Sequence, residues 1–306
     1  MVDEPKPNYD PQSILDSVLS KKDEELLPWE ICTLPSKGVY YNGKIPNGVV
    51  EVRPMGIYAD KVLTTQRLIK SGQAIDYIFK YCVRLPNGYD CQDLLSEDRT
   101  FLLYYLRGIT HGNEYEFFMN CPACDEPSQH VYNFNELWET KKGPPLDDSG
   151  MLLLEPFKVN LPYLSEQTKS DFWVKVKFLR GRDILDMLDV NAPKVDAGLP
   201  QKARNRKKKE EPDKISDRGE TLDETLEKNI NRIIVEAMGS TDREKIKNLV
   251  ARFHDNDVAA ITDWLKDNSP GIDNSIETDC PHCHQTINVP LPITEAFFRP
   301  THRRRA

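Results

Sequence analysis

The sequence contains no uninterrupted apolar run of about 18 residues, so we expect no membrane-spanning helix. The first residues are acidic and rich in proline, which is not the composition expected of a secretory signal peptide. Common catalytic motifs are also missing: GxSxG, HExxH and GxGxxG do not occur in the context that each requires. The segment LPSKG lacks the rest of a phosphate-binding loop. These absences predict a soluble protein of a reducing cytoplasm that is not an enzyme.

A disulfide scaffold is not expected either, because the chain has 306 residues and only seven cysteines, an odd number. Three of the seven are scattered, at Cys32, Cys82 and Cys91. Cys82 lies in the apolar context YIFKYCV and is expected to be a small core residue. The other four form two CxxC pairs.

The two CxxC pairs are CPAC at 121–124 and CPHC at 280–283, and a β-like segment follows each. A CxxC turn directs two thiolates at one tetrahedral ion, so we predict that Cys121, Cys124, Cys280 and Cys283 bind one structural Zn²⁺. The long separation of the pairs is compatible with this site, since the cost of loop closure grows slowly with length. A redox pair or four free thiols is the alternative. A redox CxxC usually opens a helix after a strand, and neither pair has that context.

Four histidines lie near these cysteines in the sequence, at His111, His130, His282 and His284. A catalytic zinc would keep one coordination position open and have a base nearby. Four thiolates already complete a tetrahedral site. We therefore expect no catalytic metal and no small-molecule substrate.

The distribution of charge bears on whether the protein binds nucleic acid or other proteins. The net charge of −8 argues against nucleic-acid binding by the surface as a whole. One run, KARNRKKK at 202–209, nevertheless has six basic residues in eight positions, and three arginines at 303–305 lie near the end of the sequence. The run contains no aromatic residue on which a base could stack. A zinc-ribbon protein that binds nucleic acid remains the alternative to a protein-binding function.

Composition divides the chain into four segments. Residues 1–30 form a polar N-terminal arm with one short amphipathic patch at Ile14, Leu15, Val18 and Leu19. Residues 31–189 are predicted to form an α+β domain with the first cysteine turn. Residues 190–220 are rich in charge and proline, which predicts a mobile linker. Residues 221–306 are predicted to be a helical segment whose cysteine turn packs back on the first.

Hydrophobic periodicity predicts the fold class α+β: mixed helices and short antiparallel strands, closed by a split four-cysteine zinc ribbon with a helical insertion. Residues 31–54 are expected to form a hairpin with Asn42-Gly43 and Asn47-Gly48 as turns. Two helices are expected within 57–83, strands on both sides of CPAC and at 157–161 and 172–179, and one strand after CPHC.

Helix ends can also be predicted. Ser71 and Ser96 are expected to cap helices, and Thr241 with Glu244 resembles a capping box. The apolar spacing from Leu222 to Ala237 predicts one helix that ends at Gly239. Helices are also expected around 246–253 and 258–265.

Three segments of the N-terminal third carry a family resemblance: LPSKGVYY at 34–41, VEVRPMGIYADKVL at 50–63 and RLIKSGQAIDYIFKYCV at 67–83. They are similar to the T4-type baseplate proteins of tailed phages, a family that includes a baseplate hub assembly protein. The cysteine turns and the ending Phe297-Phe298 fit the same pattern. The resemblance implies a non-enzymatic virion or assembly protein, made in the host cytoplasm. It implies protein–protein contacts with other baseplate hub or wedge subunits as partners.

Overall fold

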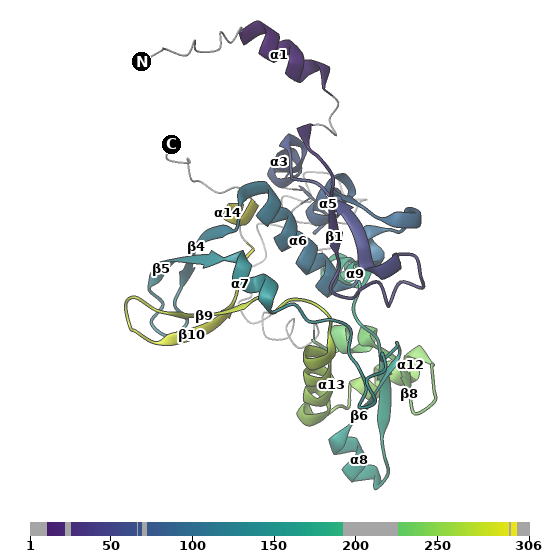
Figure 1. The fold of residues 1–306 in the computed structure, drawn as a ribbon. Helices are drawn as coiled ribbons and strands as arrows, with labels where there is room; N and C mark the ends of the chain where they lie inside the picture. Colours follow the sequence, from purple (N-terminus) through teal and green to yellow (C-terminus); the bar gives the residue numbers. More distant parts are fainter. Residues whose placement is uncertain are drawn as a thin grey trace, which may run out of the picture.

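The computed structural model describes residues 11–21, 26–65, 67–68, 72–191, 226–293 and 295–298. Helices and four small antiparallel sheets alternate along these residues (Figure 1), which confirms mixed α+β architecture. A large cluster of buried apolar side chains extends from the N-terminal sheet to the strands and helices after residue 156. Among the described residues, none of the helices combines the length and the hydrophobicity that a membrane span requires.

The N-terminal sheet has the order β1 (Glu30–Thr33), β2 (Val49–Val52) and β3 (Val83–Arg84). Glu30 pairs with Val52 in an antiparallel register, so the hairpin predicted for 31–54 is confirmed. The turn residues Asn42, Gly43, Asn47 and Gly48 all have positive φ, as the Asn-Gly pairs predicted. A Cβ on Gly48 would lie 2.7 Å from the Cα of Lys37, so this close backbone crossing requires glycine.

Helices α3 (Ile57–Thr64), α5 (Ala74–Cys82) and α6 (Ser96–His111) pack on this sheet. Cys82 is fully buried, as expected for a core residue. The N-cap of α6 is Leu95, which makes no side-chain cap bond, so the prediction of a Ser96 cap is wrong. Ser71, the other predicted cap serine, lies outside the described residues.

The first turn of α6 holds the LPSKG loop through the buried carboxylate of Asp98. This carboxylate accepts hydrogen bonds from the Ser36 amide (3.1 Å), the Ser36 hydroxyl and the Tyr41 hydroxyl. Burial raises the pKa of Asp98, while these hydrogen bonds oppose the rise. The Tyr41 oxygen also accepts a bond from the Leu95 amide at 3.0 Å. Loop and helix are thus joined by polar contacts inside the core.

The second sheet has the order β6 (Phe157–Asn160), β7 (Trp173–Val176) and β8 (Ile234–Ala237). Around it lie α8 (Pro162–Thr168), α12 (Arg243–Val250) and α13 (Asp255–Asn268), whereas α9 (Gly181–Asn191) lies beside α6 in the N-terminal body. The strands predicted at 157–161 and 172–179 are confirmed, and α8 and α9 were not predicted. Because β8 pairs with β7, residues on both sides of the predicted linker share one sheet.

The helix predicted from Leu222 to Ala237 is wrong at its C-terminal end. Residues 226–233 are helical, but Ile234–Ala237 form β8. The buried Ile234 pairs with Val176 of β7, and β-branched side chains favour such a strand. Helix α12 begins at an Asp242 N-cap whose carboxylate accepts the Glu244 and Lys245 amides. The capping box predicted at Thr241 and Glu244 is therefore wrong: the cap is Asp242, one residue later, and the third helical residue is Lys245.

Two hairpins form the lobe at the left of Figure 1. The first pairs β4 (Glu114–Asn120) with β5 (Pro127–Asn133), which confirms the strands predicted around CPAC. Helix α7 (Phe134–Glu139) follows it. The second pairs β9 (Ser275–Asp279) with β10 (Thr286–Pro290) and is followed by α14 (Glu295–Phe298). Only β10 was predicted, and β9 was missed.

Helix α1 (Pro11–Ser20) belongs to the predicted N-terminal arm and stands away from the rest of the fold in Figure 1. The basic run 202–209 and the arginines at 303–305 lie outside the described residues. So does most of the predicted linker, from residue 192 to residue 220.

The half-buried Glu97 carries a carboxyl group with an unusual environment. Burial, together with the charges of Asp98 and Glu155, raises the pKa of Glu97 to about 7. Its Oε2 atom has no hydrogen-bond partner among the described residues. The backbone of Gly271 packs against its side chain, since a Cβ there would lie 3.1 Å from the Cβ of Glu97. The fold therefore favours the protonated acid.

This environment predicts a pH dependence of stability. Because the folded-state pKa of Glu97 is raised, its contribution is full below pH 4.5 and is lost as the pH rises through about 7. Relative to Glu97→Gln, the wild-type protein should lose about 1–3 kcal/mol of unfolding free energy across that range. Urea unfolding at a series of pH values measures this difference. The exposed Glu166→Gln serves as the control, and a pH-independent difference for Glu97→Gln contradicts the prediction.

Candidate metal centre

The first cysteine turn joins β4 to β5 and has a defined backbone geometry. The Cys121 amide donates to the Glu126 carbonyl at 3.0 Å, and the Asp125 amide donates to the Cys121 carbonyl at 2.8 Å. The Ala123 amide points at the Cys121 sulfur, 3.4 Å away. Asp125 has φ 59°, which turns the chain back into β5 directly after Cys124.

The second turn, between β9 and β10, repeats this geometry position by position. The Cys280 amide donates to the Gln285 carbonyl at 3.0 Å, and the His284 amide donates to the Cys280 carbonyl at 2.9 Å. The His282 amide lies 3.4 Å from the Cys280 sulfur. His284 has φ 57° and follows Cys283 as Asp125 follows Cys124. Two copies of one turn therefore face each other.

The four sulfur atoms converge at the point where the turns meet. The Cys121 and Cys283 Sγ atoms are 3.8 Å apart, as are those of Cys124 and Cys280. All four lie within 4.8 Å of one another, close enough to hold one metal ion. A tetrahedral ion with bonds of about 2.3 Å separates its sulfur ligands by about 3.8 Å. A disulfide would need about 2.05 Å, so the pairs are not disulfides.

The electrostatics of the cluster favour a cation. Amide groups of Cys283 and His282 donate toward Cys280 and lower the pKa of its thiol to about 6. For Cys124 the Glu126 amide acts in the same direction. Burial and the three neighbouring sulfurs outweigh it and raise the pKa of Cys124 to about 12. Four thiolates at these separations repel one another, and a bound divalent cation would offset that repulsion.

The scattered cysteines lie in a different environment. Burial raises the pKa of Cys32 and of Cys82 to about 12, and that of Cys91 to about 11. They are therefore neutral thiols at physiological pH, and none belongs to the sulfur cluster.

A second contact joins the two hairpins beneath the sulfurs. Buried His130 on β5 forms hydrogen bonds to the Ser128 hydroxyl (2.7 Å) and to the Thr278 hydroxyl on β9 (3.1 Å). The Phe117 ring stacks on its imidazole. His282 contacts the Pro127 carbonyl at 3.3 Å, from the second turn to the start of β5. The histidines thus make contacts between segments and are not among the grouped ligands.

The segment after β10 is fixed to α6 and β4. The hydroxyl of Tyr104 donates to the Leu291 carbonyl at 2.9 Å, and that of Tyr115 donates to the Pro292 carbonyl at 2.8 Å. Fully buried Phe297 packs edge-on against both rings and near Phe134. These anchors are more than 170 positions away in the sequence, so only the family ending Phe297-Phe298 could have indicated them.

Comparison with known families gives one finding. Residues 31–299 match the model of a family described as T4 bacteriophage base plate protein. No curated protein and no solved structure matches the chain. The matched range contains both cysteine turns, the LPSKG loop and Phe297.

The geometry predicts that metal binding needs both turns. Cys121→Ser and Cys280→Ser each remove one of four ligands and should lower metal content from about one ion per chain to below about half. Elemental analysis after gel filtration with a mild chelator measures the content. Cys91→Ser, which changes a half-buried cysteine outside the cluster, should retain the metal. Full retention in both ligand variants would show that these sulfurs do not bind the ion.

Proposed function

We propose that this chain, which belongs to the T4 bacteriophage base plate protein family, is a structural or assembly protein of the baseplate hub of a tailed phage. It acts through contacts with other hub or wedge subunits and not through catalysis. It is made in the host cytoplasm and works in the tail of the virion. The observation that carries this proposal is the family match over residues 31–299, which covers most of the chain.

We propose Zn²⁺ as the metal. Four cysteine sulfurs at tetrahedral separations suit zinc or iron, and zinc is the redox-inert choice for a site whose role is to join two hairpins. Four protein ligands leave no position for substrate or water. The ion would therefore supply folding free energy to the lobe.

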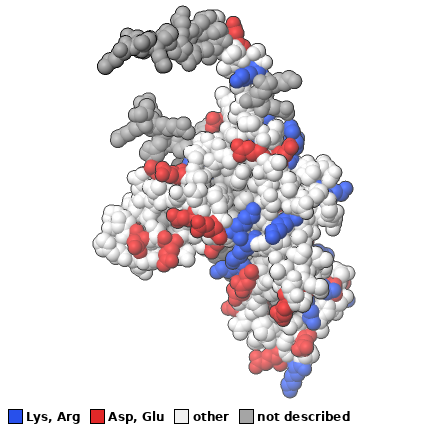
Figure 2. Space-filling model, in the orientation of Figure 1, with Lys and Arg blue, Asp and Glu red and all other residues white. Residues whose placement is uncertain are grey.

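The alternative of nucleic-acid binding finds no support in the charges of the cysteine lobe. Residues 114–133 and 275–290 contain six carboxylates and no lysine or arginine. The lobe at the left of Figure 2 accordingly carries acidic side chains. Binding of phosphate backbones depends on cationic side chains, so this lobe favours protein partners.

If zinc joins the two hairpins, its removal should destabilise both of them together. The purified chain should contain about one zinc ion, and its removal by a strong chelator should lower the unfolding temperature, because the ion holds β4–β5 to β9–β10. Inductively coupled plasma analysis and thermal melting measure the two effects. Less than about half an equivalent of zinc, or iron in its place, would contradict the choice of metal. An unchanged melting curve after zinc removal would contradict its structural role.

If the protein acts through protein–protein contacts, the N-terminal arm should be needed for assembly but not for folding or zinc binding. Deletion of residues 1–28 should leave a folded protein that still binds zinc but no longer supports baseplate assembly, because the arm carries exposed apolar side chains. Electron microscopy of particles made with the truncated protein measures assembly. The control replaces only the arm charge Asp16→Asn. Normal infectious titre with the deletion would contradict a role for the arm, and loss of soluble protein would place the arm in the folded core.

Mass spectrometry of purified virions distinguishes a permanent baseplate subunit from an assembly factor. Presence at a fixed ratio to other baseplate proteins identifies a permanent subunit, and absence identifies an assembly factor. Particles with complete baseplates in the absence of any functional chain would contradict both.

A further inference from the structure

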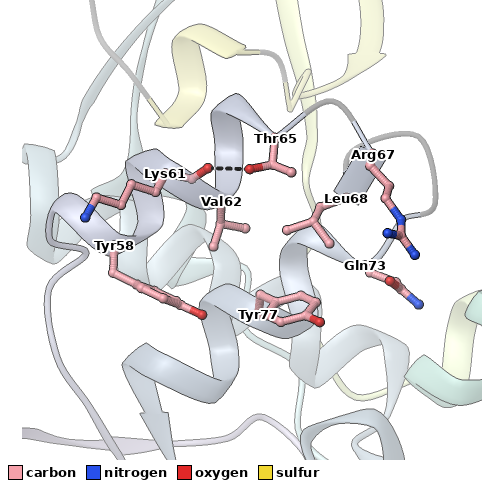
Figure 3. A pocket seen from close by; sticks show the side chains of 8 residues that line it. All are labelled: Tyr58, Lys61, Val62, Thr65, Arg67, Leu68, Gln73 and Tyr77. Carbon is pink, nitrogen blue, oxygen red and sulfur yellow. Dashed lines mark hydrogen bonds between the residues drawn. The ribbon is translucent and has the colours of Figure 1, made fainter.

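Helices α3 and α5 enclose a groove of about 380 Å³ on the surface of the N-terminal body (Figure 3). Val62, Leu68 and Tyr77 turn toward one another between the helices, and Tyr58 extends the apolar lining. The tyrosines are 38% and 42% exposed, and the neighbouring Ile57 is 75% exposed. Such an apolar lining in contact with solvent is typical of an interaction site.

The charges of this groove have one sign. Lys61 and Arg67 lie at opposite ends of it in Figure 3, and Thr65 and Gln73 are its neutral polar residues. No carboxylate lines it, and no described residue forms an ion pair with either cation. The groove is therefore suited to an apolar segment that also carries negative charge.

Helix α1 has the complementary properties. Leu15, Val18 and Leu19 are spaced so that they share one face, and they are 50%, 41% and 73% exposed. Asp16 lies next to them in the sequence. Residues 1–25 contain seven acidic and three basic residues, a net charge of −4. A helix of ten residues is marginal in water by itself and gains stability when its apolar face is covered.

The position at which the N-terminal arm leaves the fold favours an arrangement in which two copies exchange their α1 helices. Leu27 packs at the start of α3, where its Cδ1 lies 3.2 Å from the position of a Cβ on Gly56. From there α1 extends outward and away from the helices of its own chain (Figure 1). An arm that begins beside one groove and points outward can reach the same groove of a copy related by a twofold axis. Reciprocal exchange closes the contact and covers both apolar surfaces.

We propose that α1 of one copy lies in the α3–α5 groove of a second copy of this chain, with its leucines on Val62, Leu68 and Tyr77 and the acidic residues of the arm, Asp16 among them, near Lys61 and Arg67. This dimer is additional to the proposed baseplate function and does not rest on it. Its support is the match in polarity and charge between two surfaces of the same molecule, together with the outward direction of α1.

Sedimentation of the full-length chain over a concentration series tests the exchange. The wild-type protein should dimerise, and Leu19→Asp in the arm or Tyr77→Asp in the groove should weaken the dimer about tenfold or more. Met151→Asp, at a similarly exposed apolar residue of a distant loop, is the matched control. An equimolar mixture of the two variants should recover part of the association, because one intact arm still faces one intact groove. A monomer at all concentrations, or no recovery in the mixture, would overturn the proposal.

Cross-linking separates a second copy from the arm's own groove. A photoreactive residue at position 19 is placed in an equal mixture of light and ¹⁵N-labelled chains, and the cross-linked peptides are identified by mass. We expect links from residue 19 to residues 57–82. Links that join a light chain to a heavy chain should be as frequent as links between two chains of the same isotope. Links confined to one isotope would show that the arm folds back on its own chain. Either that result or links to other surfaces overturns the proposal.

Discussion

The convergence of four sulfur atoms at one point constrains the rest of the structure. Cys124 and Cys280 are 156 positions apart, yet their sulfurs lie 3.8 Å from each other. The chain between them includes the second sheet, α8 and α13, so these elements form a large loop that the cysteine turns close. Closing such a loop costs conformational entropy. A bound ion would offset this cost, because its binding free energy is gained only when both turns are in place. The site is thus best understood as a long-range link in the fold.

Buried polar side chains of helix α6 connect the cysteine lobe to the N-terminal sheet. Arg107, almost fully buried on α6, donates to the carbonyl groups of Gly112 (2.9 Å) and Glu114 (3.1 Å) and so fixes the turn into β4. Burial lowers the pKa of its guanidinium. Asp98, at the other end of the same helix, holds the LPSKG loop. Helix α6 therefore joins the N-terminal sheet to the cysteine lobe through side chains that would be costly to leave unpaired.

Local features of the fold could be predicted from the sequence, and distant contacts could not. Asn-Gly pairs, period-two strands and CxxC turns each carry their signal within a few residues, so the first hairpin and the strands around CPAC were correct. Strand β8 was mistaken for helix because Ile230, Ile233 and Ala237 follow one another at helical spacing, which carries the pattern into the strand. Its partner β7 lies about 60 positions earlier and overrides that preference. Strand β9 has only one buried apolar residue, Ile276, which leaves too little pattern to recognise. The contact of His130 with Thr278, across 148 positions, has no local signal at all.

The central claim is that a single ion bound by four sulfurs joins the two hairpins. X-ray absorption at the zinc edge of the purified full-length chain tests this claim most directly. The claim predicts a first shell of about four sulfur atoms at about 2.3 Å, with no light-atom ligand. A shell containing nitrogen or oxygen, or only two sulfurs, would mean that the turns do not share one ion and would contradict this account of the fold.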